Sequence, residues 1–395
     1  MKIAQINSTC GAGSTGRIAV EISKLLNSRG AENYIFYSQG LADGENYIKY
    51  TNTFETKTEA LRSRINGNYG FEASGATKRL ITELERIKPE IVHLHNLHSH
   101  DINLELLFTY LRRENTKIVW TFHDCWAFTA YCTYFTAFNC EKWKTICGNC
   151  AQRKQFSWFK DNSTVLFNKK KALFSGQNMT IVTPSKWLAE LVGESFLNKY
   201  PVEVIHNGID LSVFKPRESD FRSRYGITEK KMVLAVANVW EKRKGLDDVL
   251  RLAEMLGEDY QVVIVGLSKK QAESMPENIV AIQRTSSVEK LAEIYSAADV
   301  FVNPSYEDNF PTVNIEALAC GTPVVTYATG GSPESINDSC GLVVPCGDCE
   351  ALKDAVLQVK NIRPFSSELC RCRAECFNKD EKFEEYIELY ERLIQ

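Results

Sequence analysis

The chain has 395 residues, of which 44% are hydrophobic and 25% are charged, and both values are ordinary for a folded globular protein. Its formal net charge of −3 gives no polycationic signal, which excludes nucleic acid from the expected partners. The sequence has neither an apolar run near the ~20 residues of a membrane span nor a signal-peptide core after Met1. We therefore expect about two to three domains in a cytoplasmic protein, or in one that is peripheral on the inner face of the cytoplasmic membrane.

The first elements alternate between strand and helix patterns, which favours a parallel α/β sheet. A strand is expected over 2–7, a glycine-rich loop over 8–16 and a helix over 17–27. In such a sheet, the loop between the first strand and the first helix is where an anion usually binds. The loop lacks the G-x-G-x-x-G spacing of dinucleotide sites, so by itself it is weak evidence for a ligand.

Histidines gather where the next strands end. Strands are expected over 34–38, 91–95 and 117–122, and the last of them is followed directly by His123. A side chain at such a strand end points into the crevice of an α/β sheet, although a lone histidine there could equally be structural. Four more histidines precede it, and a metal ion is conceivable where two of them share one face of a strand. These four are His93, His95, His98 and His100.

The segment 125–150 is dense in cysteine and aromatic residues and reads as an insert. Four thiolates within 19 residues can surround a tetrahedral Zn²⁺ ion, and two of them have C-x-x-C spacing. The spacing is not that of a common zinc finger, so partly buried free thiols and disulfides stay open as alternatives. The aromatic side chains suit either stacking on a ligand or packing of the insert itself. The candidate zinc ligands are Cys132, Cys140, Cys147 and Cys150.

The alternating pattern restarts in the second half of the chain, which predicts another sheet domain. A strand over 232–237 leads into a basic loop with Arg243 and Lys244, and a helix follows from Gly245. This loop is either a solvated surface or a group of cations that neutralises a phosphate ligand. The remaining expected features are strands over 260–265 and 279–282, Arg284 after the second of these, and a helix over 379–394.

The most informative stretch, 303–334, reads as a strand end, a loop, a helix, a second strand and a Gly-Gly turn. Pro311 suits the first helical position, because its fixed φ fits a helix and its missing N–H costs nothing there. A helix N-terminus attracts an anion, and the turn at 330–331 lets backbone amides approach a ligand. Asp308 precedes the helix and Glu316 lies within it. The pattern suits a ligand with phosphates in its middle and hydroxyl-rich groups at both ends.

This stretch resembles the signature of the retaining nucleotide-sugar glycosyltransferases of family 4, which have the two-domain GT-B fold. The signature is an acid, seven residues and a Glu, followed by A-x-x-x-G-x-P-V-V and T-G-G-x-P-E. Glu316 matches the second acid, whereas Asp308 stands where the family usually has Glu, which leaves the donor sugar open. The strings H-N-G-I-D at 206–210 and G-L-V-V-P-C-G-D at 341–348 are similar to the family's domain connector and closing motif.

The resemblance implies an α/β protein of two Rossmann-like domains that face each other across a cleft. The implied division is an acceptor-side domain over 1–207, a donor domain over 208–376, and a C-terminal helix over 377–395 that packs back on the first domain. The cysteine-rich insert 125–150 of the first domain would form a wall or lid of the acceptor pocket.

The resemblance also implies roles for particular residues. His123 and Asp308 would contact the donor sugar, and Glu316 would hold the nucleotide ribose, so these three match catalytic positions. No D-x-D metal motif stands at the site, so cations would stabilise the leaving diphosphate and no cofactor is expected for catalysis. The residues matched to donor binding are Gly16, Arg17, Arg243, Lys244, Arg284, Asn309, Phe310, Pro311 and Thr312.

The implied function is transfer of a hexose or N-acetylhexosamine, with retention, from a nucleotide-diphosphate sugar that we expect to be UDP-linked. The expected acceptor is a glycan or a lipid-linked molecule in surface polysaccharide or glycolipid synthesis. The lysine run 169–171 reads as a solvated face or as a peripheral contact with anionic lipid headgroups. Two other interpretations stay open: a GT-B nucleotide-sugar epimerase or phosphorylase, and a non-catalytic binding protein with a degenerate site.

Overall fold

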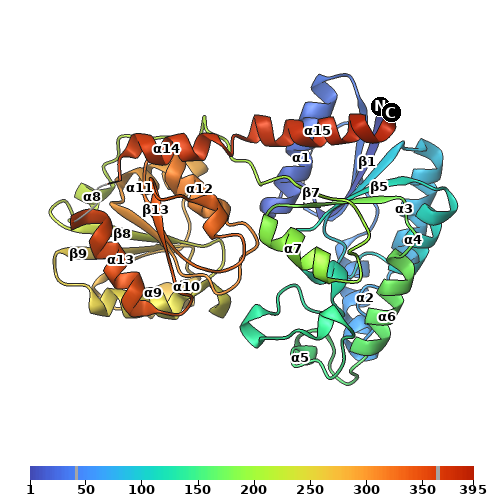
Figure 1. The fold of residues 1–395 in the computed structure, drawn as a ribbon, viewed down its shortest axis with the longest axis horizontal. Helices are drawn as coiled ribbons and strands as arrows, with labels where there is room; N and C mark the ends of the chain where they lie inside the picture. Colours follow the sequence, from blue (N-terminus) through green and yellow to red (C-terminus); the bar gives the residue numbers. More distant parts are fainter. Residues whose placement is uncertain (41–42, 362–364) are drawn as a thin grey trace. The chain divides into compact units, whose positions relative to one another are not determined.

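The computed structural model describes residues 1–40, 43–361 and 365–395. The chain divides into two compact units, one of Met1–Ile205 with Phe383–Gln395 and one of His206–Lys382. Each unit is built on a parallel sheet that is covered by helices (Figure 1). Parallel strands need crossover helices, which bury the faces of the sheet. The α/β class expected from the sequence is confirmed.

Within the described residues, the sheet of the first unit has seven strands: β1 (Lys2–Thr9), β2 (Glu32–Gln39), β3 (Tyr47–Lys49), β4 (Ile91–Leu94), β5 (Lys117–Thr121), β6 (Met179–Thr183) and β7 (Val202–Val204). Their order across the sheet is β3-β2-β1-β4-β5-β6-β7. Across the sheet, the strands follow the reverse of their order in the sequence from β3 to β1, and they follow their sequence order from β4 to β7. Ligands of open α/β sheets bind outside the carboxyl ends of the strands at such a reversal.

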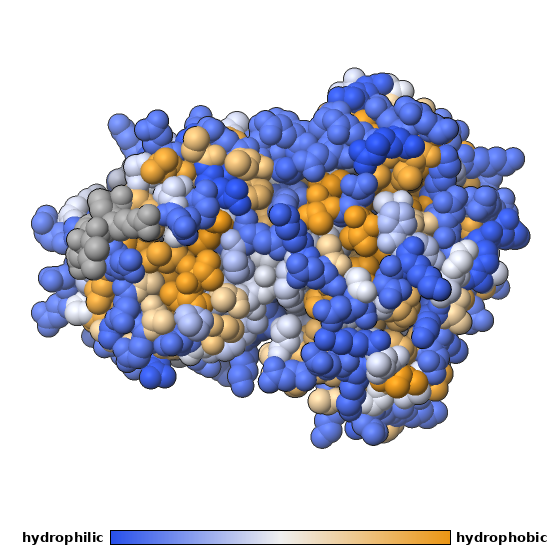
Figure 2. Space-filling model, viewed as in Figure 1, coloured by the Kyte–Doolittle hydropathy of each residue, from blue (hydrophilic) through white to orange (hydrophobic). Residues whose placement is uncertain are grey.

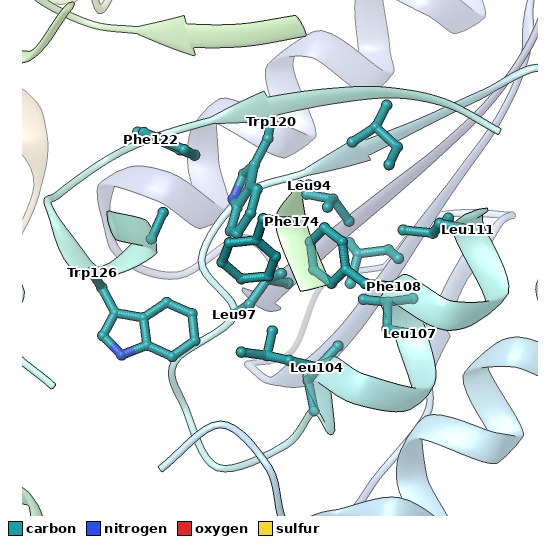
Figure 3. Close-up of a cluster of buried hydrophobic side chains, with 14 of the residues drawn as sticks. Leu94, Leu97, Leu104, Leu107, Phe108, Leu111, Trp120, Phe122, Trp126 and Phe174 are labelled. Atoms are coloured by element: carbon teal, nitrogen blue, oxygen red, sulfur yellow. The ribbon is translucent and has the colours of Figure 1, made fainter. Parts of the chain in front are cut away.

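Helices cover both faces of this first sheet. On one face, Ile3 of the sheet shares a core with Ile22 and with Ile387, near the end of the chain. On the other face, Trp120 packs against Phe108 at 5.3 Å between ring centroids (Figure 3). The helices of the first unit are α1 (Gly13–Ser28), α2 (Thr53–Asn66), α3 (Ser74–Ile87), α4 (Leu104–Arg113), α5 (Arg153–Phe156), α6 (Ser163–Phe174), α7 (Lys186–Glu194) and most of α15 (Lys379–Ile394).

Within the described residues, the sheet of the second unit has six strands: β8 (Lys231–Val236), β9 (Tyr260–Val265), β10 (Ile279–Ile282), β11 (Val300–Asn303), β12 (Val324–Tyr327) and β13 (Gly341–Val344). Their order is β10-β9-β8-β11-β12-β13, so the order reverses between β8 and β11. Phe301 and Val302 of β11 point into different cores on the two faces. The helices are α8 (Phe221–Arg224), α9 (Leu246–Met255), α10 (Lys269–Glu273), α11 (Val288–Ala297), α12 (Thr312–Ala319), α13 (Cys349–Asn361) and α14 (Ser367–Glu375).

Two helix starts differ from the sequence-based expectation. The first helix begins at Gly13 and not at Arg17, so that Gly16 lies in its first turn. α12 begins at Thr312, and Pro311 is its N-cap with an extended backbone (φ −74°, ψ 109°). The prediction that Pro311 takes the first helical position was therefore wrong by one residue.

The cysteine-rich insert follows β5 as a mostly irregular segment with three short 3₁₀ turns, η1 (Trp126–Phe128), η2 (Thr136–Phe138) and η3 (Lys142–Lys144). Most of its aromatic rings are turned inward: Trp126, Phe128 and Tyr131 are at most 2% exposed. Phe128 packs against Trp143, Tyr131 packs against Phe156, and Trp126 packs against Tyr69. These buried rings therefore serve packing, as the plainer interpretation expected, whereas Tyr134 stays partly exposed and Phe138 is 49% exposed.

The surface of the view in Figure 2 is mostly hydrophilic, with separate apolar areas on each unit. Among the helices of the described residues, none combines the length and the apolar composition that a bilayer span needs.

Candidate active site

Most of the predicted site residues follow strands at, or next to, the position where the strand order of their sheet reverses. In the second unit, the loop after β8 carries Arg243 and Lys244, and the loop after β11 carries Asp308. In the first unit, Gly16 follows β1, and His123 follows β5, the neighbour of β4. Because parallel strands have their carboxyl ends at one edge of a sheet, loops from adjacent strands meet there.

Opposite charges meet at this edge of the second sheet. Lys244 Nζ forms an ion pair with Asp308 Oδ2, and the two side chains are 20% and 12% exposed. Arg243 Nη1 donates to the Glu307 carbonyl oxygen at 3.2 Å, and its Nε pairs with Glu241 at 3.1 Å. The loop after β8 is thus tied to the loop after β11. A diphosphate that binds Lys244 has to compete with the Asp308 carboxylate for the same ammonium group.

A glycine keeps the backbone of Asp308 in position. Gly330 has φ +53°, and a Cβ built on it would lie 1.7 Å from the Asp308 carbonyl oxygen, so only glycine fits. The N–H of Gly331 donates to the carbonyl oxygens of Asp308 at 3.3 Å and Asn309 at 3.1 Å. The expectation that this turn offers its amides to a ligand was therefore wrong for Gly331, whose N–H binds within the protein.

Glu316 lies in the second turn of α12 and is held by a buried tyrosine. Tyr295 of α11 is fully buried and donates its hydroxyl to Glu316 Oε2 at 3.0 Å. Burial, and then the nearby carboxylate, raise the pKa of Tyr295 well above its usual value, so the phenol keeps its proton and remains the donor. This bond fixes the orientation of a carboxylate that stays partly exposed.

In the residues between Asp308 and α12, the side chains are mostly buried, so that backbone groups are the main candidates for contact with a ligand. Asn309 and Phe310 are each 4% exposed, and the Phe310 ring packs edge-on against His206 at 4.8 Å. Pro311 is buried, whereas Thr312 at the start of the helix is partly exposed. A role for Asn309 and Phe310 in donor binding therefore falls to their amides.

Arg284 and Arg17 are both exposed. Arg284 follows β10, which is parallel to β9 and β8, so it lies at the same carboxyl edge as Lys244 but follows a strand that is two positions away from β8. Arg17 is on α1 next to Gly16, whose Cβ position is 2.9 Å from Thr9 Oγ1. The absence of a side chain at Gly16 allows the first turn of the helix to rest on the end of β1.

In the first unit, a chain of hydrogen bonds sets the protonation of His123. The amide nitrogen of Gln5 donates to Ala19 O at 3.1 Å and to Asn33 Oδ1 at 3.2 Å, so its Oε1 is the acceptor that faces His95 Nε2 at 3.2 Å. Burial lowers the pKa of His95 far below its usual value, so the ring is neutral, and a proton on Nε2 leaves Nδ1 as an acceptor.

His123 Nε2 lies 3.1 Å from His95 Nδ1 and must therefore be the donor in this contact. Burial lowers the pKa of His123 to about 4, so this ring too is neutral at pH 7. Its Nδ1 then carries a lone pair and can accept a hydrogen bond from a hydroxyl group. This is the chemistry that a sugar-binding histidine needs.

Two further histidine contacts support this edge of the sheet. His98 Nε2 pairs with Asp124 at 2.8 Å; burial opposes the charge on His98, but the carboxylate outweighs it and raises the pKa. His93 Nδ1 lies 2.6 Å from the Tyr390 hydroxyl of α15, and its Nε2 lies 2.8 Å from Thr121 Oγ1. The histidines thus act as hydrogen-bonding groups of the core.

The structure joins none of the four candidate zinc ligands in a disulfide, and the same holds for the other nine cysteines, all of which lie within the described residues. Cys132 is buried, and burial raises its pKa to about 12, with smaller contributions from the other three thiols. The four side chains therefore share one neighbourhood around Cys132, Cys140, Cys147 and Cys150. Even so, no group of three or more His, Cys, Asp or Glu within residues 1–40, 43–361 and 365–395 is placed to hold a metal ion. The zinc site stays a prediction without geometric support.

The lysine run behaves differently from the expected solvated face. Lys169 and Lys171 are exposed, but Lys170 is fully buried. Lys170 Nζ donates to Trp126 O at 2.8 Å and Thr129 O at 3.0 Å and lies 3.4 Å from the centroid of the Trp126 ring. Its role is to hold the insert onto α6, and only the two outer lysines can meet a lipid headgroup.

Several residues that complete the site carry no signal in the sequence. The contacts of Gln5 and Tyr295 depend on which elements pack together, and neither residue belongs to a motif. The His98–Asp124 pair could have been found, because both residues follow the ends of adjacent expected strands, β4 and β5.

Two family models match the chain. The model described as "Glycosyltransferase Family 4" matches residues 15–213, which are half of the chain. The model described as "Glycosyl transferases group 1" matches residues 217–372. The first match falls on the first unit except for its last residues, 206–213, and the second match lies within the second unit.

Curated relatives carry similar names. The chain is 34% identical to the D-inositol 3-phosphate glycosyltransferase of Mycobacteroides abscessus over 169 residues, which cover 39% of this chain and 38% of that protein. It is 24% identical to the putative colanic acid biosynthesis glycosyl transferase WcaC of Escherichia coli over 416 aligned positions, which cover 100% of both chains. The chain thus matches less than half the length of the first relative and the full length of the second.

Solved structures of the same fold cover nearly the whole chain. The sucrose-phosphate synthase of Thermosynechococcus elongatus superimposes with a TM-score of 0.73 at 17% identity, over 99% of this chain and 98% of that one. HepE of Anabaena, in complex with UDP-glucose, superimposes with a TM-score of 0.70 at 13% identity, over 99% and 100%. This likeness confirms the GT-B fold expected from the sequence.

Proposed function

This chain belongs to glycosyltransferase family 4, and from that premise we propose that it moves a hexose or N-acetylhexosamine from a UDP-linked donor to a glycan or lipid-linked acceptor. The proposed reaction retains the configuration of the anomeric carbon and serves surface polysaccharide or glycolipid synthesis at the cytoplasmic side of the membrane. A relative of matching length is named for colanic acid biosynthesis, and a structure of the same fold contains UDP-glucose.

The observation that carries the proposal is the paired Lys244 and Asp308 at the strand reversal of the second unit, just before α12. An ammonium group and a helix N-terminus together attract a diphosphate. When the diphosphate takes Lys244, the Asp308 carboxylate is released to accept hydroxyl groups of the donor sugar. Lys244 then binds the diphosphate and Asp308 binds the sugar, whereas in the absence of the donor these two side chains neutralise each other.

The bond changes of the proposed transfer need no metal ion. The bond between the anomeric carbon and the phosphate oxygen breaks, and the acceptor oxygen bonds to that carbon on the same face. The acceptor proton passes to the leaving phosphate. Lys244 and Arg243 stabilise the charge that develops on the phosphate. Glu316 holds the ribose, and the Nδ1 lone pair of His123 accepts a hydrogen bond from a sugar hydroxyl group.

A broad screen of nucleotide sugars and acceptors with mass-spectrometric readout tests this function. The change Glu316→Gln keeps an acceptor oxygen for Tyr295, so the protein should fold while transfer falls by about two orders of magnitude. Glu293 is a matched control, because it is a partly exposed carboxylate on a neighbouring helix that pairs with Lys290. We expect Glu293→Gln to transfer normally and the wild type to transfer in the presence of EDTA.

Other outcomes of the same screen separate the alternatives. An altered sugar that forms from the donor without any acceptor would indicate an epimerase. Donor binding with neither hydrolysis nor transfer across the screen would indicate a binding protein. Wild-type turnover by the Glu316→Gln variant would remove Glu316 from the site.

A further inference from the structure

α2 is oriented with its apolar side toward the solvent. Its buried residues are Thr56 and Ser63, whereas Phe54, Leu61 and Ile65 are 82%, 48% and 42% exposed. At ~100° per residue, the three apolar side chains lie within about 40° of one another around the helix, opposite the buried pair. An amphipathic helix on a soluble domain normally has the reverse arrangement. This face is therefore built to meet an apolar partner.

The apolar stripe continues onto the segment after α5. Trp158 and Phe159 are 48% and 71% exposed, and their rings meet edge to face at 6.4 Å. The backbone N–H of Trp158 donates to the backbone carbonyl oxygen of Arg64 at 2.8 Å, and Arg64 Nη1 donates to the backbone carbonyl oxygen of Gln155 at 3.0 Å. These bonds join the segment to the last turn of α2. We call the combined surface, α2 with residues 153–161, the α2 surface; Figure 2 shows apolar areas among hydrophilic atoms on this unit.

The charge of the α2 surface is opposite to that of the chain. Its two segments, 53–66 and 153–161, contain six Lys and Arg residues and three Asp and Glu residues, a net charge of +3 against −3 for the whole chain. On α2, Lys57, Arg62 and Arg64 lie on the two flanks of the apolar stripe. The acids lie nearer the buried side, and Glu59 pairs with Arg62. Apolar side chains flanked by cations match the boundary between acyl chains and anionic headgroups.

We propose that the α2 surface docks the protein onto an anionic bilayer, with Trp158, Phe159, Leu61 and Ile65 entering the headgroup boundary. A second copy of the chain is a poorer occupant, because a symmetric contact would place two surfaces of the same positive charge against each other. The inference rests on the proposed function for its purpose only, since a lipid-linked acceptor is found at a bilayer.

Sedimentation with vesicles of phosphatidylcholine and phosphatidylglycerol tests the docking. The full chain should bind vesicles with 30% phosphatidylglycerol, should bind pure phosphatidylcholine at least tenfold more weakly, and should be released by high salt. The double variants Leu61→Gln/Ile65→Gln and Trp158→Ser/Phe159→Ser should each bind at least tenfold more weakly. Leu369→Gln is the matched control, because Leu369 is 47% exposed on α14 of the second unit.

Cationic residues have their own matched pair of variants. Lys154→Glu/Lys160→Glu changes two exposed residues of the α2 surface and should reduce binding to anionic vesicles. Lys269→Glu/Lys270→Glu changes two exposed lysines on α10 of the second unit and should leave binding unchanged. Equal losses from the two charge variants would mean that net charge alone governs binding, and would overturn the assignment to this surface.

Trp158 also provides a direct probe of insertion. Of the six tryptophans, Trp158 alone is exposed in the described structure. Lipids brominated near the headgroup should quench the fluorescence of the wild type and not that of Trp158→Phe. Quenching that is the same in both proteins would overturn the proposed orientation.

The outcomes also separate docking from catalysis. Vesicle binding by a protein that transfers no sugar would support the surface and contradict the proposed function. Normal transfer to a water-soluble acceptor by a variant that has lost vesicle binding would support both. Failure of the wild type to bind anionic vesicles, or a dimer in solution that Leu61→Gln/Ile65→Gln dissociates, would overturn the docking proposal.

Discussion

Replacement of Gly330 by alanine tests whether its close contact with Asp308 sets the geometry of the donor site. Two costs can be separated. A left-handed backbone conformation costs a non-glycine residue roughly 1–2 kcal/mol. A Cβ that would stand 1.7 Å from the Asp308 carbonyl oxygen also has to push this loop away. That shift weakens the two hydrogen bonds from Gly331, at about 1 kcal/mol each.

The free energy of unfolding of the second unit should therefore fall by about 3–4 kcal/mol in Gly330→Ala. Gly226→Ala is the control: its φ is +64°, but the described structure leaves open space around its Cβ position, so only the backbone cost of roughly 1–2 kcal/mol applies. For a unit of this size each kcal/mol lowers the Tm by about 2–4 °C. Thermal unfolding followed by circular dichroism measures the difference.

The same pair of variants links the contact to function. A displacement of Asp308 by about 1 Å should lower transfer roughly 100-fold in Gly330→Ala, while Gly226→Ala stays near the wild type. Equal Tm values for the two variants would refute the reasoning, because the contact with Asp308 would then impose no constraint beyond the backbone angle.

Three further predictions concern the first unit. In ¹⁵N-labelled protein at pH 7, His123 should be the neutral Nε2–H tautomer, and His95→Leu should remove this preference whereas His93→Leu keeps it; an Nδ1–H signal in the wild type would contradict the hydrogen-bond chain. Burial lowers the pKa of His93 to about 3, below its unfolded value near 6.5. The folded state is therefore stabilised by neutral His93 above pH 6.5. This stabilisation is lost as the pH falls below 6.5, by about 1.4 kcal/mol per pH unit. Tryptophan fluorescence should show the first unit becoming less stable between pH 6.5 and 4, and a constant unfolding midpoint across this range would count against buried neutral histidines. If zinc is structural, metal analysis should find about one equivalent and Cys147→Ser should lower the Tm, whereas metal-free protein with an unchanged Tm in the variant would end that prediction.

The parallel α/β class could be predicted, and the candidate site residues could be proposed, because the signals for both are local. Alternation of strand and helix patterns follows from which faces each element must bury, and the acid pair of Asp308 and Glu316 has a fixed spacing on one loop and helix. The role of the aromatic side chains in the insert 125–150 could not be predicted, because composition does not distinguish rings that face a ligand from rings that pack inside the protein. For Lys170, a run of three lysines gives no sign that the middle one is buried between two backbone carbonyl groups.

The amino-acid sequence by itself determined the elements, their parallel layering and the motif that contains Glu316, because periodicity and spacing are properties of neighbouring residues. Only the tertiary structure decided that Asp308 pairs with Lys244, that Gln5 and His95 set the tautomer of His123, and that α2 turns its apolar stripe outward. Each of these depends on residues that are distant in the chain, and their contacts arise from the order of the strands and the packing of the helices.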